Sequence, residues 1–484
     1  MIDERNATWK LLLPHHPDVK ILALGLKNSQ LISLARTWVQ IDYDTIINKT
    51  PGNHFPAKLA RRLNKIPNNQ FYRNTFYDII ILGSTSKENS SHLAKTYPSL
   101  LKTNGVMISI DGINFRPFHL HFPGRGTIEE YGVLPPGNAR VIFPLTNRRI
   151  RDKGLHFHIP SSRNAQIGIW IATMLNSIGV SGHLKRNGIT LLKNGKISKT
   201  RYLKGWLSKR LSLMVEDIIL YCGSDTAKRK ITGLILLKDH PDLVLKVADT
   251  PEGKDAITCE STALNSLSTS SLRNMQVPQL LFEDEWAGYL IQVQSSLARQ
   301  SKKQTSTLEK QHFTALSALS HLDRRFLVFS KTTYFREIQQ LSGQQKKELP
   351  RQIKALIKKI SDENFKQSPV LCHRVHGDFA PWNMSVAPNE LMLWDWEDSI
   401  GDGIVFTDIF HFIIRKAILV GPWCGTDTIM QEIKKACFTL QNIATLPVDV
   451  DFAISLQIWV TREYLRSPHP ELIKIANLLE FTHG

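Results

Sequence analysis

The first 185 residues alternate short apolar runs with segments that have helical spacing. Apolar runs of strand length lie at 19–24, 77–82 and 106–110. Helical patterns lie at 29–38 and 90–101, and a Thr-Asn-Gly turn is expected at 103–105. Strand, helix and strand in this order produce right-handed crossovers onto a parallel sheet. We therefore predict a Rossmann-like α/β domain over residues 1–185.

The apolar pattern changes after residue 213, where closely spaced strands precede a long helical region. We expect strands at 217–221, 231–237, 243–248 and 288–293. A helix with Leu264 and Leu267 on its inner side is expected after the third strand. The pattern predicts an α+β domain with two lobes, a small lobe over 214–294 and a mostly helical large lobe over 295–484.

The net charge of +18 is concentrated in the first part of the chain. From Ser296 onward, 23 Lys and Arg residues face 20 Asp and Glu residues, a surplus of 3, so the other 15 charges lie upstream. The stretch 183–210 is rich in basic residues and has no acidic one: Lys185, Arg186, Lys193, Lys196, Lys199, Arg201, Lys204, Lys209 and Arg210. Such a segment could meet an anionic surface or ligand. A solvated basic connector over 186–213 is the interpretation we favour.

Nothing in the sequence predicts secretion or membrane insertion. The first ten residues, MIDERNATWK, are charged and lack the apolar core of a signal peptide. No apolar run approaches the ~20 residues of a transmembrane helix. The cysteines are scattered and have no metal or redox spacing: Cys222, Cys259, Cys372, Cys424 and Cys437. We therefore expect a cytoplasmic protein with reduced thiols.

Two His-x-His pairs are candidates for metal binding, namely His119 with His121 and His156 with His158. Residues two apart on a strand share a face, so each pair could chelate an ion. Neither pair has a carboxylate or cysteine at a sequence spacing that is typical of a metal site. Half-buried structural histidines are the interpretation we favour.

The segment Val375–Ser399 carries the clearest chemical pattern in the chain. The segment contains His376, Gly377 and Asp378 in a row, and Asn383 comes five residues after the aspartate. An apolar strand then follows and ends at Asp395. Phosphoryl transfer needs a group that orients the attacking hydroxyl, and ligands for the metal ions that neutralise the phosphates. Mg²⁺ prefers hard oxygen ligands. A loop carboxylate, an amide oxygen and a second carboxylate supply such a set.

This pattern resembles the aminoglycoside phosphotransferase and choline kinase family, whose hallmark is His-Gly-Asp with Asn five residues after the Asp. The second acidic motif of the family is matched by 393–397 (LWDWE), and 408–412 (DIFHF) is similar to its Asp-Leu-x-x-Phe helix start. The resemblance covers the last 270 or so residues. It implies a protein-kinase-like fold, ATP and Mg²⁺ as cofactors, and a small-molecule acceptor. The implied roles are catalysis for Asp378, metal binding for Asn383 and Asp395, and loop support for His376.

The upstream strands are similar to the nucleotide lobe of the same family. Lys246 is the one charge in an apolar strand, which is costly unless an anion lies nearby. The phosphates of ATP and Glu260, 14 residues on, are the expected partners. The loop with Gly223, Ser224 and Lys230 departs from a glycine-rich pattern. We expect its backbone N–H groups and the Lys230 side chain to hold phosphates.

The combined pattern favours an ATP-dependent phosphotransferase that acts on a hydroxyl of a small polar molecule, with ATP bound between two lobes. A true protein kinase is disfavoured, because Gly377 stands where an arginine would precede the catalytic aspartate, and D-F-G and A-P-E motifs are absent. A catalytically silent nucleotide-binding scaffold is the alternative.

The first domain has a weaker resemblance of its own. Residues 77–111 resemble the later half of a class I methyltransferase domain, with its Leu-Lys-x-x-Gly turn before a strand. Where that family has a glycine-rich turn, residues 23–30 (ALGLKNSQ) contain a single glycine. Glycine permits the close backbone approach that a nucleotide-like ligand needs. We expect a degenerate, structural or substrate-presenting domain, and a bifunctional enzyme with a working methyl-transfer half is the alternative.

Overall fold

The computed structural model divides the 484-residue chain into two compact units. Unit 1 comprises Met1–Lys254 and Phe282–Ser296, and unit 2 comprises Asp255–Leu281 and Leu297–Gly484. The structure describes residues 5–16, 18–26, 28–44, 61–65, 76–83, 97–110, 127–135, 140–157, 163–180, 184, 188–195, 198–223, 228–270, 272, 274–297, 306–345, 348–448 and 450–481. Each unit has a hydrophobic core of its own.

Unit 1 begins with a 3-10 helix, η1 (Arg5–Leu12), and a group of parallel strands. These strands are β1 (Lys20–Leu24), β2 (Gln40–Asp44), β3 (Leu63–Lys65), β4 (Tyr77–Leu82) and β5 (Leu101–Ser109). They lie in the order β3-β2-β1-β4-β5, all parallel, with α1 (Asn28–Thr37) between β1 and β2 in the chain. In this doubly wound order the chain reverses direction across the sheet between β1 and β4.

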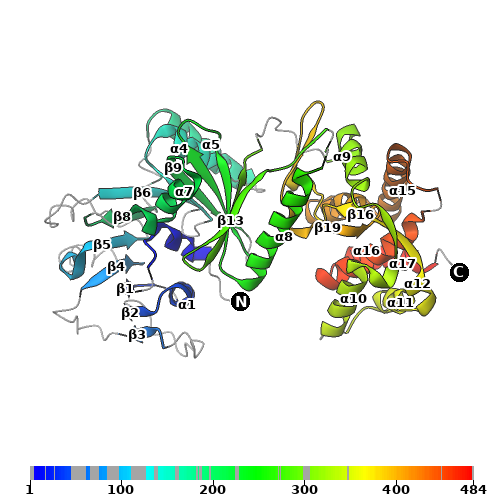
Figure 1. Ribbon diagram of the computed structural model, residues 1–484, viewed down its shortest axis with the longest axis horizontal. Helices are drawn as coiled ribbons and strands as arrows, with labels where there is room; N and C mark the ends of the chain where they lie inside the picture. The colour runs from blue at the N-terminus through cyan, green and yellow to red at the C-terminus, as the bar shows by residue number, and fades with distance from the viewer. Residues whose placement is uncertain are drawn as a thin grey trace. The chain divides into compact units, whose positions relative to one another are not determined.

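Antiparallel strands continue the same sheet without a break (Figure 1). They are β6 (Thr127–Leu134), β7 (Val141–Pro144), β8 (Ile189–Lys193), β9 (Val215–Cys222), β10 (Ile231–Leu237), β11 (Leu243–Ala248), β13 (Leu280–Trp286) and β14 (Tyr289–Ser295). Among the described residues the sheet has thirteen strands, in the order β13-β14-β11-β10-β9-β7-β6-β8-β5-β4-β1-β2-β3. The β7–β9 pair, with Ile142 opposite Leu220, joins two segments that we assigned to separate domains.

Several expected boundaries differ from the observed ones. Strand β5 begins at Leu101, and the expected turn at 103–105 is instead an interruption in its pairing with β4, where the partner of Tyr77 is Leu101 but that of Ile79 is Val106. Most of the expected helix 90–101 lies outside the described residues, and 97–100 is a 3-10 turn. The expected connector 186–213 contains β8, which lies between β5 and β6, and the helix α7 (Leu203–Leu211).

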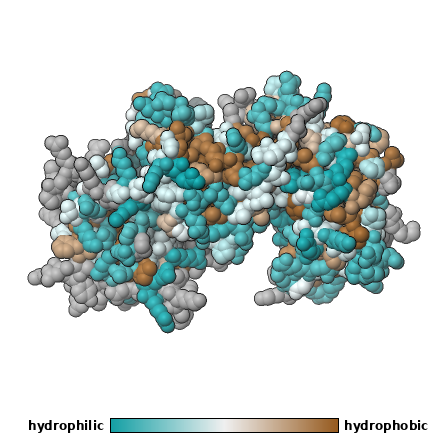
Figure 2. Space-filling model, in the orientation of Figure 1, coloured by the Kyte–Doolittle hydropathy of each residue, from teal (hydrophilic) through white to brown (hydrophobic). Residues whose placement is uncertain are grey.

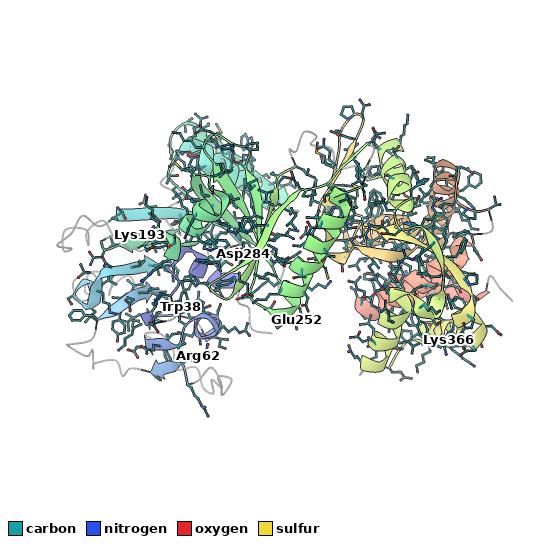
Figure 3. The ribbon with its side chains drawn as sticks, in the orientation of Figure 1. Trp38, Arg62, Lys193, Glu252, Asp284 and Lys366 are labelled. Carbon is teal, nitrogen blue, oxygen red and sulfur yellow. The ribbon has the colours of Figure 1, made fainter. Side chains whose placement is uncertain are left out.

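An aromatic cluster in the core of unit 1 joins segments far apart in the sequence. The ring of His15 stacks on Trp38 (labelled in Figure 3) at 4.7 Å and contacts Trp286 at 4.6 Å. Trp206 of α7 packs against the same Trp286, at 6.5 Å. Burial lowers the pKa of His15 to about 4, so this ring is neutral at pH 7. The start of the chain, α7 and β13 therefore share one core.

Basic side chains of the 183–210 segment pair with carboxylates of unit 1. Lys193 (labelled in Figure 3) forms an ion pair with Glu129, and Lys204 lies 3.5 Å from Asp217. Arg210 of α7 donates to Asp284, also labelled, at 2.9 Å. These ion pairs use part of the positive charge within the fold.

Helices α4 (Arg148–His156) and α5 (Arg163–Ser177) pack next to β7 through Ile150, Leu155 and Ala172. The other side of α5 exposes large apolar side chains at helical spacing, namely Ile167, Trp170, Ile171 and Met174, and Ile178 directly after the helix is exposed as well. Figure 2 shows hydrophobic side chains on the surface near this helix. His156 is the last residue of α4, where its Nδ1 donates to the carbonyl oxygen of Asp152 (2.8 Å), rather than lying on a strand. His119, His121 and His158 lie outside the described residues.

Unit 2 is mostly helical, and the chain enters it within α8 (Pro251–Ser268). Its other helices are α9 (Lys310–Ser320), α10 (Thr333–Gln344), α11 (Arg351–Ile360), α12 (Glu363–Gln367), α13 (Thr407–Phe410), α14 (Lys416–Leu419), α15 (Thr426–Ile443), α16 (Phe452–Arg466) and α17 (Pro470–Phe481). Two three-stranded sheets have the orders β12-β18-β17 and β15-β16-β19. Their strands are β12 (Met275–Gln276), β15 (Arg325–Val328), β16 (Pro369–Val375), β17 (Met384–Val386), β18 (Leu391–Leu393) and β19 (Ile400–Ile404).

The core of unit 2 surrounds the segment that carries the chemical pattern. Phe379 and Trp396 are fully buried in it, with Phe410 of α13 and Trp459 of α16. Strands β17 and β18 form a short antiparallel hairpin, with Val386 opposite Leu391. Among the described residues of the whole chain, no helix is long and apolar enough to cross a membrane.

Candidate active site

The loop after β16 is fixed by a carboxylate on a distant helix. Asp408, in the first turn of α13, accepts hydrogen bonds from the backbone N–H groups of His376 (2.8 Å) and Gly377 (2.9 Å). Gly377 has φ +85°, and a Cβ atom there would lie 2.1 Å from the carbonyl oxygen of Asp398. A residue with a side chain therefore does not fit at this position. The two constraints fix where the next residue, Asp378, projects its carboxylate.

Asn383 holds one oxygen of the Asp378 carboxylate. Its Nδ2 atom donates to Asp378 Oδ2 at 2.7 Å and to the Asp378 carbonyl oxygen at 3.0 Å. Both partners are acceptors, so the amide nitrogen must face Asp378 and the amide oxygen must point elsewhere. The spacing of five residues brings these two side chains together across the 3-10 turn η7 (Pro381–Asn383), as the sequence pattern predicts. The amide oxygen of Asn383 points away from Asp378, so it could serve as a metal ligand.

His411 lies against the other oxygen of the same carboxylate. Its Nε2 atom is 2.7 Å from Asp378 Oδ1, an ion-pair distance, although the N–H direction is not aligned as in an ideal hydrogen bond. Burial raises the pKa of Asp378, but the interactions of its carboxylate with His411 and His376 outweigh it. The pKa of Asp378 therefore lies below its usual value, and the carboxylate is ionised at pH 7.

Asp395 follows β18 and has a left-handed backbone, with φ +68°. Its charge raises the pKa of Asp378, although less than the histidine contacts lower it. The backbone on either side of this residue is tied to the site. The N–H of Trp394 donates to the carbonyl oxygen of Asn383 at 3.0 Å, and the N–H of Trp396 donates to Glu260 Oε1 at 3.4 Å.

The imidazole of His376 links the loop to the second acidic strand. It is fully buried, its Nδ1 accepts from the N–H of Asp378 (3.2 Å), and its Nε2 donates to the carbonyl oxygen of Trp394 (3.0 Å). Its ring packs on Trp396 with a centroid distance of 4.6 Å. With both nitrogens engaged by backbone groups, the ring is placed to hold the loop rather than to exchange protons with a ligand.

The upstream residues of the predicted nucleotide site are placed in different parts of the molecule. Lys246 is buried on β11 in unit 1, opposite Thr232 of β10 and Gln292 of β14. Glu260 is buried on α8, in the part that belongs to unit 2. The Lys246–Glu260 pair crosses the boundary between the units and stays a prediction.

The predicted phosphate loop is described only in part. Gly223 follows β9 directly, and Lys230 precedes β10, half-buried. Ser224 lies outside the described residues. The loop therefore joins two paired antiparallel strands, as a phosphate-binding turn would.

The sequence pattern did not predict two residues of this site, Asp408 and His411. Asp408 was expected to begin a helix, and His411 had no expected role. A signal was present for both, since each is a polar residue in an otherwise apolar stretch, 404–414, that would need a partner once buried. The partner's identity was not readable, because it lies about 30 residues upstream, as the separations for Gly377–Asp408 and His376–Asp408 show.

The described residues contain no group of three His, Cys, Asp or Glu side chains arranged to hold a metal ion. The predicted metal ligands are an amide, Asn383, and one carboxylate, Asp395. Mg²⁺ is commonly bound by one or two protein oxygens together with water and substrate phosphates. The residues present fit that mode of binding, in which the nucleotide supplies further ligands.

Comparison with known proteins finds no matching family model and no matching curated protein. Among solved structures, the chain is similar to the amicoumacin kinase hAmiN in complex with AMP-PNP, Ca²⁺ and Ami, with 13% identity over 58% of this chain and 93% of that chain, and a TM-score of 0.39. It is also similar to aminoglycoside 2'-phosphotransferase-IIIa in its GDP complex, with 13% identity over 58% and 97% and a TM-score of 0.37.

A third similar structure is the apoenzyme of macrolide 2'-phosphotransferase MphH from Brachybacterium faecium. It has 12% identity over 57% of this chain and 97% of that chain, with a TM-score of 0.31. At these scores the similarities do not assign the chain to a family.

Proposed function

We propose that this protein is an ATP-dependent phosphotransferase that acts on a hydroxyl of a small polar molecule. The observation that carries the proposal is the setting of Asp378. Its carboxylate is held by Asn383 on one side, faces His411 on the other, and stands on a loop tied to Asp408. Asp395 lies close enough to influence its charge. An oriented, ionised carboxylate beside an amide oxygen and a second carboxylate is what phosphoryl transfer requires.

In the proposed reaction, Asp378 orients the acceptor hydroxyl and takes its proton. The acceptor oxygen forms a bond to the γ-phosphorus of ATP, and the bond between that phosphorus and the ADP oxygen breaks. Asn383 and Asp395 would hold Mg²⁺, which neutralises charge on the phosphates when bound. His376 would keep the loop in place through its two backbone hydrogen bonds.

The nucleotide-binding part of the proposal involves residues from both units. Lys246 would bind phosphate oxygens and would itself be held by Glu260, while Gly223, Ser224 and Lys230 would contact the phosphates. One contact within unit 2 supports a role for Glu260 near the metal ligands. Its carboxylate accepts from the N–H of Trp396, the residue next to Asp395. We propose a kinase-like fold for residues 214–484.

An ATP-consumption assay with a panel of hydroxylated acceptors tests the proposal. The panel includes sugars, amino alcohols and aminoglycoside-like compounds, and Mg²⁺ is supplied. We expect Asp378→Asn to lower transfer by about 10²–10⁴-fold, the usual contribution of a general base. Binding of a fluorescent ATP analogue should be retained in this variant. Asp395→Ala should lower both transfer and the Mg²⁺ dependence of nucleotide binding.

Two results would decide against the proposal. Near-full turnover by Asp378→Asn would show that the assigned role is wrong. If the wild-type protein binds ATP but does not consume it in the presence of any acceptor of the panel, the silent nucleotide-binding scaffold is favoured.

The doubly wound strand order supports a second, smaller proposal, a Rossmann-like α/β fold at the start of the chain. Its methyl-transfer alternative predicts that S-adenosylmethionine raises the melting temperature of the full chain. The full chain is the right material, because β7 and β9 pair across the expected domain boundary. A melting temperature that does not change with S-adenosylmethionine would remove the methyl-transfer alternative.

A further inference from the structure

His411 stands at a break in helical geometry next to the proposed catalytic residue. Helix α13 (Thr407–Phe410) continues into a single π-helical turn, His411–Arg415, before α14 begins. π-Turns inside helices are rare and are frequent at functional sites. This one begins at the residue whose Nε2 atom lies 2.7 Å from Asp378 Oδ1.

The position of His411 is one that an apolar side chain would fill at lower cost. Its neighbours Phe410, Phe412 and Ile413 are fully buried, and the imidazole itself is 6% exposed. Its ring meets Trp459 edge to face, with centroids 6.3 Å apart. Burial of a polar ring in such a setting is unfavourable unless a polar partner compensates for it. The partner is the Asp378 carboxylate.

A carboxylate on a loop is rotationally soft, because the terminal torsion of aspartate has broad, two-fold preferences. In this site both oxygens are engaged, Oδ2 by Asn383 and Oδ1 by His411. A hydrogen bond from Asn383 at Oδ2 and the close contact of His411 Nε2 at Oδ1 together restrict the plane of the carboxylate. Each oxygen keeps a further acceptor position, so the group can still receive the hydrogen of a hydroxyl.

We propose that His411 is a positioning residue for Asp378, a proposal that rests on the phosphotransferase function above. Its imidazole orients the carboxylate toward the acceptor hydroxyl and does not itself touch the nucleotide or the acceptor. The loss of His411 should therefore reduce the rate of the transfer step with little change in the affinity for ATP.

Three substitutions at this position separate orientation from packing. His411→Leu and His411→Phe keep an apolar side chain but have no donor, and we expect kcat to fall by about 10- to 100-fold, the range of a hydrogen bond to a charged group. His411→Gln restores an N–H donor of similar reach, and kcat should return to within about threefold of wild type. KM for ATP should stay within about twofold in all three. His469→Gln is the control, because His469 Nδ1 accepts only the backbone N–H of Glu471 at the start of α17 among the contacts described.

A measurement independent of turnover follows the same contact. In protein labelled with ¹⁵N-histidine, the Nε2 resonance of His411, assigned through its loss in His411→Gln, should shift when Asp378 is changed to Ala. The resonance of His469 should not shift. An unchanged His411 resonance would show that the two side chains do not interact in solution, and the proposal would be wrong.

The kinetic outcomes distinguish this inference from the function on which it rests. If His411→Leu folds and keeps wild-type kcat while Asp378→Asn is inactive, the positioning role is overturned and the phosphotransferase function stands. If Asp378→Asn itself retains turnover, the proposed function fails and the positioning role fails with it. Should His411→Leu not fold, the comparison of His411→Phe with His411→Gln decides in the same way.

Discussion

The backbone N–H of Gly377 donates to Asp408 Oδ1 at 2.9 Å, across 31 residues of sequence. The same carboxylate accepts from His376, so one buried side chain satisfies two consecutive N–H groups of the loop. Buried backbone donors are almost always paired, and a loop without secondary structure depends on side chains for this purpose. Asp408 therefore decides whether the 376–378 loop has a single conformation.

Asp408→Ala should impair both stability and transfer. Two buried N–H groups would lose their acceptor, at about 1–3 kcal/mol each, so we expect the free energy of unfolding to fall by about 2–6 kcal/mol. Urea denaturation measures this change, and kcat should fall by at least about tenfold as the loop loosens. Asp402→Ala is a matched control, because Asp402 Oδ2 accepts from the N–H and hydroxyl of Thr333 at the start of α10. It should lose stability but keep kcat, and equal losses of kcat would contradict the assignment.

Gly377→Ala should be far more damaging than an ordinary glycine substitution. The new Cβ would lie 2.1 Å from the Asp398 carbonyl oxygen, a backbone atom that cannot move aside, so the loop must shift. Gly288 has a similar φ of +84° with open space around it, so Gly288→Ala should cost only the left-handed strain of about 1–2 kcal/mol. Thermal unfolding compares the two variants. Comparable melting temperatures would show that the loop is more adaptable than its contacts indicate.

The buried Lys10 and the half-buried Asp249 form an ion pair, at 2.8 Å, that ties η1 to the residue after β11. Burial opposes the charged form of Lys10, but Tyr289 and Asp249 outweigh it and raise its pKa. Burial also raises the pKa of Asp249, but Lys10 and Arg229 lower it by more, so the net shift is downward. Because the pKa of Lys10 is raised, its stabilisation of the fold is fully present below about pH 10.4. This stabilisation is lost as the pH rises through the pKa of the folded state. Because the pKa of Asp249 is lowered, its stabilisation of the fold is fully present above about pH 3.9. This stabilisation is lost as the pH falls through the pKa of the folded state.

Lys10→Met should therefore cost about 3 kcal/mol of unfolding free energy, the lower end for a broken buried pair. The difference from wild type should be constant between about pH 5 and 9 and should shrink in acid below about pH 4. Urea denaturation over a pH series measures it. The double variant Lys10→Met with Asp249→Leu should recover part of the loss, since the carboxylate that lost Lys10 is then removed as well. The recovery should be incomplete, because Arg229, 3.9 Å from Asp249, loses this partner. A difference that is the same at pH 3 and pH 7 would show that the pair contributes nothing through its charges.

A fragment that begins at residue 214 should not reach the stability of the full chain. Its first strand, β9, would lose its partner β7 and become an exposed edge, and Trp286 would lose His15 and Trp206. Unpaired edges and exposed apolar surface favour aggregation. Size-exclusion chromatography of fragment 214–484 should show aggregated protein. A monomeric fragment with the urea midpoint of the full chain would contradict this prediction and favour an independent domain.

The apolar face of α5 should contribute little to the stability of the isolated protein. Trp170 is 65% exposed and Met174 is 55% exposed, and substitutions at exposed sites usually change stability by less than about 0.5 kcal/mol. Trp170→Ser with Met174→Ser should therefore leave the melting temperature nearly unchanged but reduce the fluorescence of a hydrophobic dye. Ala172→Ser, on the buried side of α5, is the contrast, and it should lower the melting temperature. A large loss of stability in the double variant would show that the face is covered.

Local patterns in the sequence determined a good part of this protein. The apolar runs at 231–237 and 243–248 coincide with β10 and β11, because a strand buried on both faces has a near-continuous apolar pattern of limited length. The spacing between Asp378 and Asn383 placed those two side chains in contact, because one short turn separates them. Period and spacing report on the conformation of neighbouring residues, and at these positions nothing distant competes with them.

Tertiary structure alone decided which distant segments meet. The pairing of Ile142 with Leu220 merges the expected domains into one sheet, and neither strand carries a mark of its partner. The contacts of Asp408 with Gly377 and of His411 with Asp378 arise in the same way, from helices packed against a loop. The physical reason is that pairing over such separations depends on the summed packing of the whole core, whereas a local pattern shows only that a residue will be buried and will need a partner.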